Sequence, residues 1–227
     1  IDNELSGDIQ IGIDATLGGN GRINGDASIS GTLGAGASIG TLTIAGDLTL
    51  GDTSTLEVEF DNDGADQIIV EGIVDLQGGT INFVPEDENV FGVFTYEILT
   101  AEGGINGAFN TTLAPNYALI DLRYEGNSLF ADIITQIGTG VELSPQSNLT
   151  ANYLNDRLVQ GAASSTLETF KALVNLNPVT ELNSALSQLH PEAYAATSSI
   201  SLIQGLSISD SLSKIATQKN TRQNSIT

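Results

Sequence analysis

The chain has 227 residues, with 28 acidic and 7 basic side chains, one His, and no Cys, Met or Trp. Its net charge of -21 at pH 7 argues against nucleic acid as a partner, because an acidic surface repels phosphate backbones. The lack of Cys excludes a disulfide framework, thiolate zinc sites and cysteine nucleophiles. No apolar run reaches the ~18 residues that a membrane-spanning helix needs.

The composition changes after Glu142. Residues 1–142 hold 23 acids and 2 bases (2 - 23 = -21) and 23 of the 25 glycines, whereas residues 143–227 hold 5 acids and 5 bases. Such a shift marks a boundary between architectures. We therefore expect a turn-rich, acidic first domain over 1–142. The opening at Ile1, without an initiator Met or a signal peptide, indicates a piece of a longer chain.

Short strands are expected throughout the first domain. Apolar and polar residues alternate in residues 8–13, 41–44, 47–50 and 55–60, with Gly-rich breaks between them. A phrase containing Gly recurs at positions 7, 25 and 46, and more loosely at 72, at intervals of 18, 21 and 26 residues. An imperfect repeat of about 20–25 residues in a chain of short strands is typical of a solenoid.

The repeat predicts a parallel β-helix, in which each strand pairs with the equivalent strand of the next coil, ~4.8 Å away. Inward side chains at period two would form apolar columns, Gly would permit the corners, and outward acids would keep the stack soluble. About 135 residues at ~21 per coil make roughly six coils. A β-sandwich or jelly roll is the competing fold.

The end of the first domain is rich in aromatic residues, with eight of them between Phe83 and Phe130. Larger side chains suggest a wider, better-filled end that closes the last coil. We predict an aromatic cap over about 80–135 that forms the stability core and seeds folding. Its principal residues are Phe94, Tyr96, Phe109, Tyr124 and Phe130.

Helices are expected over 143–216. Ser144 and Pro145 fit the N-cap and first helical position, residues 165–168 form a capping-box pattern, and Asn-Pro at 177–178 and His-Pro at 190–191 indicate two further starts. The apolar face of the first helix is predicted from periodicity, and residues 217–227 are expected to be a disordered tail. That face comprises Leu149, Tyr153, Leu154 and Leu158.

Four phrases resemble passenger domains of bacterial type V autotransporters, and they occur in the order found in that family. Residues 38–47 (SIGTLTIAGD) and 65–72 (ADQIIVEG) resemble repeats of the passenger stem. Residues 96–109 (YEILTAEGGINGAF) resemble the C-terminal autochaperone region, and residues 185–195 (ALSQLHPEAYA) the helical stretch before the translocator barrel.

The resemblance implies a right-handed parallel β-helix, secretion through the outer membrane, and location at the bacterial cell surface or release from it. It also implies a C-terminal twelve-stranded translocator barrel as partner, which this sequence does not contain. Some family members cleave themselves at an Asn-Asn pair. Only the isolated Asn220 and Asn224 stand near the end here, which departs from that pattern.

The nearest approach to a metal site is an acidic loop containing Asp61, Asp63 and Asp66, spaced i, i+2 and i+5 around Gly64. Oxygen ligands around a Gly suit Ca²⁺, but Gly72 stands where a calcium loop needs its bidentate Glu. The alternative is an acidic turn between coils. We expect no bound metal and no cofactor.

No catalytic pattern stands out. His190 is the single His, it lies at a Pro-marked helix start, and no G-x-S-x-G is present. The run at 86–88 is expected to be a solvated loop. A lyase acting on acidic polysaccharide would need cationic residues, and the first domain has only Arg22 and Arg123. We therefore expect no enzymatic activity.

Three functions remain after this sequence reading. The first is a structural and secretion module that supports an upstream effector or adhesin region. The second is an adhesin or receptor-binding fragment that contacts host cells itself, and the third is a polysaccharide-active enzyme. The neutral helices after Glu142 would permit a homodimer, whereas the acidic stem repels its own copy at low salt.

Overall fold

A computed structural model describes residues 3–87, 90–160, 164–176 and 179–189. Within these ranges the protein is mainly β, with seventeen strands and three helices, as the sequence predicted in outline. The chain divides into two compact units, Ile1–Thr135 and Gln136–Thr227. The division falls seven residues before the compositional change at Glu142, because residues 136–142 belong to no strand and lead into the first helix.

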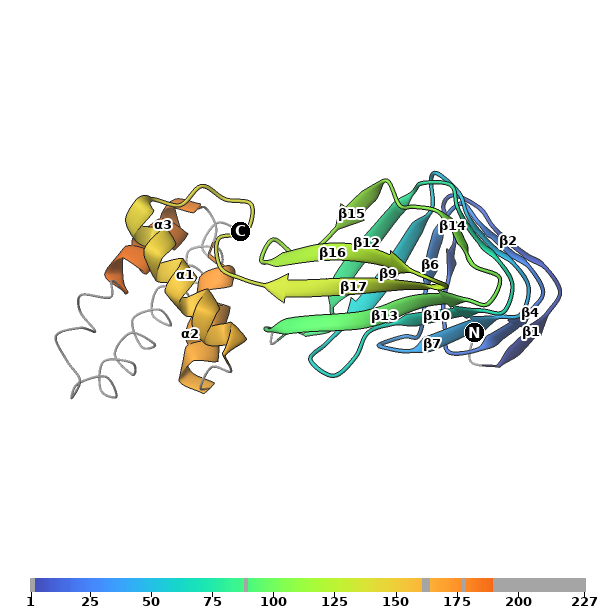
Figure 1. Cartoon of the computed structure of the whole chain (residues 1–227), viewed down its shortest axis with the longest axis horizontal. Helices are drawn as coiled ribbons and strands as arrows, with labels where there is room; N and C mark the ends of the chain where they lie inside the picture. Colours follow the sequence, from blue (N-terminus) through green and yellow to red (C-terminus); the bar gives the residue numbers. More distant parts are fainter. Residues whose placement is uncertain (1–2, 88–89, 161–163, 177–178, 190–227) are drawn as a thin grey trace, which may run out of the picture. The chain divides into compact units, whose positions relative to one another are not determined.

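The strands of the first unit form three sheets (Figure 1). In sheet order, the first contains β1 (Glu4–Ser6), β4 (Arg22–Asn24), β7 (Thr41–Ile44), β10 (Gln67–Val70), β13 (Val93–Ala101), β17 (Ser128–Thr135) and β16 (Ala118–Glu125). The second contains β14 (Ile105–Gly107), β11 (Val74–Leu76), β8 (Leu48–Leu50), β5 (Ala27–Ile29) and β2 (Ile9–Ile11). The third contains β15 (Thr111–Leu113), β12 (Thr80–Pro85), β9 (Thr55–Phe60), β6 (Thr32–Gly34) and β3 (Thr16–Leu17).

From β1 to β15, each sheet pairs a strand in parallel with the strand three places later in the chain. In the first sheet, successive partners are Leu5, Ile23, Ile44, Val70 and Ala101, at offsets of 18, 21, 26 and 31 residues. The first three offsets equal the intervals of the Gly phrase. The parallel ladders also rule out the antiparallel sandwich that the sequence left open.

The core lies between the sheets and consists of inward columns of aliphatic side chains. Along β8, Leu48 and Leu50 are fully buried while Thr49 between them is half-buried and outward, as period-two alternation requires. Each such Leu or Ile contributes about 1.5–3 kcal/mol by leaving water. Phe60 and Phe83 add an edge-to-face pair in the same core, with ring centroids 6.4 Å apart.

The Gly-Asp repeat forms one corner of the unit, the turns that connect strands of the first sheet to strands of the second. The Asp8 carboxylate accepts the amide of Asp26 at 3.0 Å, and the Asp26 carboxylate accepts the amide of Asp47 at 2.8 Å. Preceding Gly residues lie directly over one another, so that a Cβ on Gly25 would stand 2.5 Å from the carbonyl carbon of Gly7. Side chains larger than hydrogen do not fit this corner, which explains why the phrase repeats.

The first sheet ends differently from the other two, because its last two strands run antiparallel. β17 pairs with β13 and β16 pairs with β17, joined by a two-residue turn at Gly126 and Asn127. A bulge interrupts the β13 ladder between Glu97 and Leu99, which lets Ile98 and Leu99 both be buried although they are consecutive.

The second unit contains α1 (Pro145–Val159), α2 (Ser164–Val174) and α3 (Val179–Gln188), which contact one another in pairs. Ser144 is the N-cap of α1, accepting the amide of Ser147, and Pro145 is in the first turn, as predicted. The second and third helices are also confirmed. The predicted starts at 177–178 and 190–191, the segment 190–216 and the tail 217–227 lie outside the described residues.

The predicted apolar face of α1 is wrong in part. The helix buries small side chains and Leu158 against its neighbours, whereas Leu149 is 64% and Tyr153 56% exposed. Small residues allow close helix approach, and Ser147 also donates its hydroxyl to the Asn183 carbonyl of α3 at 3.2 Å. The buried residues of α1 are Ser147, Thr150, Ala151 and Leu158.

Candidate functional site

The residues of the predicted cap come together at the antiparallel end of the first sheet, on β13, β17 and β16. There the inner face is closed by aliphatic side chains, since Leu99, Leu129, Ala131 and Ile133 are all buried. Phe94 faces Ile133 and Tyr96 faces Ala131 across the β13–β17 ladder. Both rings are half-buried against the core and stack on each other, with centroids 5.7 Å apart.

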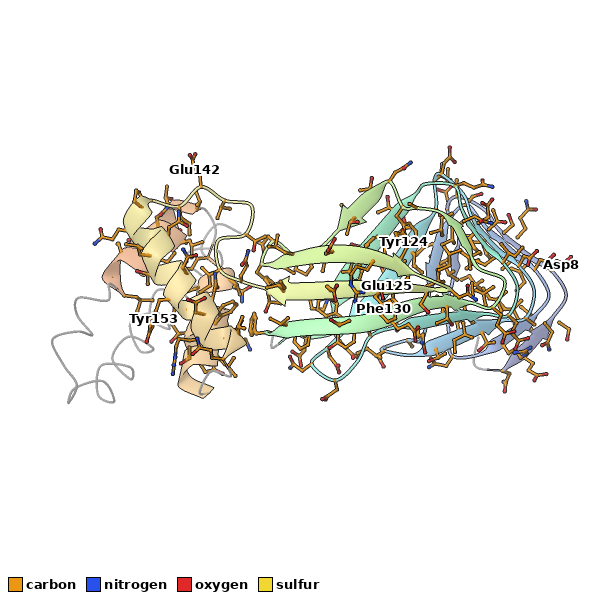
Figure 2. The ribbon with its side chains drawn as sticks, in the orientation of Figure 1. Asp8, Tyr124, Glu125, Phe130, Glu142 and Tyr153 are labelled. Carbon is orange, nitrogen blue, oxygen red and sulfur yellow. The ribbon has the colours of Figure 1, made fainter. Side chains whose placement is uncertain are left out.

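We predicted that five aromatic residues form the stability core of the cap, and for three of them the structure corrects this prediction. Phe109 is half-buried at the core margin, and Tyr124 is 40% exposed on the edge strand. Phe130 lies on the outer face, because it alternates with the inward Leu129 and Ala131. Figure 2 shows Tyr124, Glu125 and Phe130 close together on β16 and β17. Composition revealed the aromatic enrichment, but only the strand register decides which face each ring occupies.

A charged network covers the outer face beside Phe130. The Arg123 guanidinium lies 5.3 Å from the Phe130 ring centroid and donates to Asp132 and Glu125. Thr95 donates its hydroxyl to the same Asp132 carboxylate at 2.6 Å. These donors, Arg123 first, lower the pKa of Asp132 below its usual value. The network therefore ties β13, β17 and β16 together through side chains, and Arg123 is engaged with groups of its own sheet.

The acidic loop does not bring its three carboxylates together. Asp61 accepts the amides of Asp63 and Gly64 at 2.7 and 2.8 Å, which closes the turn. Asp63 is exposed at the tip. Among the residues that the structure describes, no group of three or more His, Cys, Asp or Glu side chains is placed to hold a metal ion.

Asp66 has a different role, as a buried acceptor for one amide just before β7 and one within β9. Its side chain is 3% exposed and accepts two amides, from Gly40 through Oδ1 and from Glu59 through Oδ2, each at 2.9 Å. Burial raises the pKa of Asp66 to about 6, although the two amides favour the charged form. The nearby carboxylates of Glu59 and Glu57 raise it further.

Tyr96 connects the acidic loop to the antiparallel end. Its hydroxyl donates to the Asp61 carbonyl oxygen at 2.8 Å, across 35 positions of sequence. Burial, together with the charges of Asp61 and Asp63, raises the pKa of Tyr96 to about 12. The phenol is therefore a neutral donor at physiological pH. This contact makes the loop that the sequence suggested for calcium a structural support for β13.

A polar groove of about 550 Å³ runs along the outer face of the second sheet. It is lined by Asp8, Asp26 and Asp47 of the Gly-Asp corner, and Figure 2 labels Asp8 on that unit. Asp8 accepts the amide of Asp26, Asp26 that of Asp47, and Asp47 that of Ile73 at 2.7 Å. The carboxylates thus have structural partners, and the groove holds no arrangement of nucleophile, base and acid.

Sequence reasoning missed two features that become evident from the strand register. A column of five threonines runs down the outer face of the third sheet. A signal was present, because each of them begins a strand. The column comprises Thr16, Thr32, Thr55, Thr80 and Thr111. The second feature is the series of hydrogen bonds from the Asp carboxylates of the Gly-Asp phrase, which we interpreted as a repeat without giving its Asp residues a role.

Comparison with known proteins gives no family assignment. No family model matches the chain, and no curated protein matches it in sequence. His190 lies outside the described residues. No helix in the described ranges combines the length and apolar character required to span a membrane.

Proposed function

We propose that residues 3–135 form a right-handed parallel β-helix that serves as the membrane-proximal passenger stem of a classical autotransporter. Three parallel sheets in which every strand pairs with the third following strand support the solenoid. The offset of one coil, 18 to 31 residues, supports its repeat. The order of the four family-like phrases supports the autotransporter origin. In this role the chain acts at the bacterial cell surface, next to its own translocator barrel.

One observation carries the functional proposal: the parallel stack ends in the antiparallel β13–β17–β16 ladder. Residues in the β16–β17 hairpin contact each other across a two-residue turn, so little chain entropy is lost in forming it. Parallel coils require contacts between residues 18 to 31 positions apart. The hairpin is thus suited to form first and to present β13 as a template on which preceding coils add one at a time.

That order of folding suits secretion. A chain that emerges from a pore C-terminal end first would fold the antiparallel end outside the membrane. Each added coil would then prevent the chain from sliding back into the pore. The acidic surface contributes by keeping the emerging coils apart from other copies. The function proposed is therefore structural: folding and display of whatever region precedes this stem.

A surface-display assay tests this function. The chain is fused ahead of a translocator barrel, and external protease measures the displayed fraction. Leu129→Ala at the antiparallel end should lower display more strongly than Leu33→Ala in the third sheet, although both side chains are fully buried. Equal display for both variants, at equal loss of thermal stability, would contradict the proposal.

A further inference from the structure

The sequence contains three Asn-Gly steps, and all of them lie in the first unit. An Asn that precedes Gly is prone to lose its side-chain amide, because Gly has no side chain to keep its backbone nitrogen away from the Asn carboxamide. The three steps share this local chemistry, but the structure places their carboxamides in different surroundings. The steps are Asn20-Gly21, Asn24-Gly25 and Asn106-Gly107.

Two of the three carboxamides are held by neighbouring groups. The Asn20 side-chain oxygen accepts the backbone amide of Thr41 at 2.9 Å. The Asn24 side chain accepts a hydrogen bond from Arg22 Nε at 2.8 Å and donates one to the Glu4 carboxylate at 3.4 Å. Asn24 also ends β4, which lies between β1 and β7 in the first sheet. Attack on either carboxamide therefore requires these contacts to break first.

Asn106 lies in a more open position. It is the middle residue of β14, a strand of three residues at the edge of the second sheet, whose one neighbour among the described strands is β11 (Figure 1). Asn106 and Gly107 are both exposed, and the Asn106 carboxamide forms no hydrogen bond within the described residues. Fraying of a short edge strand opens this step without unfolding the core of the unit. The Asn106 side chain is thus free to reach the geometry in which the Gly107 nitrogen attacks it.

We propose that Asn106 is a self-modification site, at which the chain converts its own carboxamide to a carboxylate. The backbone nitrogen of Gly107 loses its proton to solvent and attacks the side-chain carbonyl carbon of Asn106. The new carbon–nitrogen bond closes a succinimide ring, and the side-chain nitrogen takes up a proton and leaves as ammonia. Water then opens one of the two ring carbon–nitrogen bonds, which gives aspartate or isoaspartate at position 106. Water is the one co-reactant, and no group is oxidised or reduced.

The register of the second sheet gives this conversion a structural consequence. Asn106 pairs with Asp75 of β11, so a carboxylate at position 106 would stand directly opposite one that is already present. Like charges directly opposite each other destabilise a strand pair. Isoaspartate would in addition lengthen the backbone of β14 by one carbon and disturb its register against β11. Both products would loosen β14 and uncover Ile105, which packs half-buried against the core. The inference is independent of the proposed secretion function, since it concerns the folded first unit alone.

Peptide mapping by mass spectrometry tests the proposal on the full chain, incubated in mildly alkaline buffer because the attacking nitrogen must lose its proton. In the folded chain, conversion at Asn106 should be at least several-fold faster than at Asn20 or Asn24. In urea, where the three steps lose their different surroundings, the rates should converge to within a few-fold. Arg22→Gln removes the Nε donor to the Asn24 side-chain oxygen. This variant should accelerate conversion at Asn24 and leave the rate at Asn106 unchanged.

Two outcomes of this experiment would overturn the inference. One is conversion in the folded chain that is as fast at Asn20 or Asn24 as at Asn106, and the other is conversion at Asn106 in urea but not in the folded chain. A second measurement, of the melting temperature, tests the structural consequence. Asn106→Asp should lower it by more than Asn106→Ser, which adds no charge, and adding Asp75→Asn to Asn106→Asp should restore most of the loss. Equal melting temperatures for Asn106→Asp and Asn106→Ser would show that the two opposed carboxylates do not repel.

Discussion

Arg22 and Glu71 form a bidentate ion pair across the first sheet, with both nitrogen–oxygen distances at 2.7 Å. They are 49 positions apart in the chain, and β7 lies between β4, which carries Arg22, and β10, which ends just before Glu71. The pair therefore links β4 to the end of β10 across the intervening β7, on the solvent side of the sheet. It also neutralises one of the two cations of an otherwise acidic unit.

The first prediction concerns this pair. Hydrogen bonding to Arg22 lowers the pKa of Glu71, so its contribution to stability is present above the ordinary value of 4.5 and is lost as pH falls through the lowered pKa. Arg22→Gln should raise the Glu71 pKa toward 4.5, measured by carboxyl-carbon NMR titration. Arg123→Gln, which removes the other cation of this unit, is the control and should leave the Glu71 titration unchanged.

The second prediction concerns pH and Asp66. Its folded pKa of about 6 exceeds the ordinary 3.8, so the folded state binds the proton more tightly, and stability falls as pH rises through this window. Relative to Asp66→Asn, the wild-type protein should gain up to about 3 kcal/mol of unfolding free energy between pH 7 and pH 4. Urea titrations at each pH measure this difference. Asp63→Asn at the exposed tip is the control, and a pH-independent difference for Asp66→Asn would refute the burial argument.

The third prediction separates the core of the antiparallel end from its aromatic surface. Leu129→Ala should cost about 2–5 kcal/mol and, if the hairpin forms early, should mainly slow folding. Leu33→Ala, also fully buried, should mainly accelerate unfolding. Phe130→Ala should cost clearly less than Leu129→Ala, because the ring lies on the outer face. Stopped-flow folding and unfolding rates for the three variants test this order, and a slow-folding Leu33→Ala would contradict it.

The fourth prediction uses two glycines that differ in the space beside them. A Cβ at Gly25 would lie 2.5 Å from backbone atoms of Gly7, whereas a Cβ at Gly12 meets nothing within 4 Å. Gly25→Ala should therefore destabilise the first unit by more than about 2 kcal/mol, because it forces apart the two turns that contain Gly7 and Gly25. Gly12→Ala should be neutral or stabilising by about 0.4–1 kcal/mol, because it restricts the unfolded chain. Thermal melts of both variants and of the wild-type protein measure these two changes in stability.

The fifth prediction concerns calcium. Asp61 and Asp66 already accept backbone amides, so added Ca²⁺ should shift the melting temperature no more than Mg²⁺ at equal ionic strength. A large rise with Ca²⁺ that chelator reverses and that Asp61→Asn abolishes would show that the loop rearranges around the ion.

The sequence by itself determined, for most strands, which side chains point inward and which point outward. Residues 41–44 and 55–60 were predicted as strands and are β7 and β9 with those bounds, because period-two alternation records which side chains must leave water. The Gly intervals likewise predicted the strand pairing, because only Gly fits where successive Gly-Asp turns approach each other. Ser144 and Pro145 marked the start of α1, because capping is a local interaction.

The tertiary structure decided where parallel pairing gives way to antiparallel pairing, the faces of the aromatic rings and the buried side of α1. Alternation is the same in parallel and antiparallel strands. The Gly126-Asn127 pair between β16 and β17 is typical of a hairpin turn, but we did not use it to predict their reversal. A shift of one residue exchanges the faces of a strand, and the register that buries Leu129 turns Phe130 outward. In α1, Ser147 and Asn183 pair across helices, and this contact, which no periodicity encodes, selected the small-residue face over Leu149 and Tyr153.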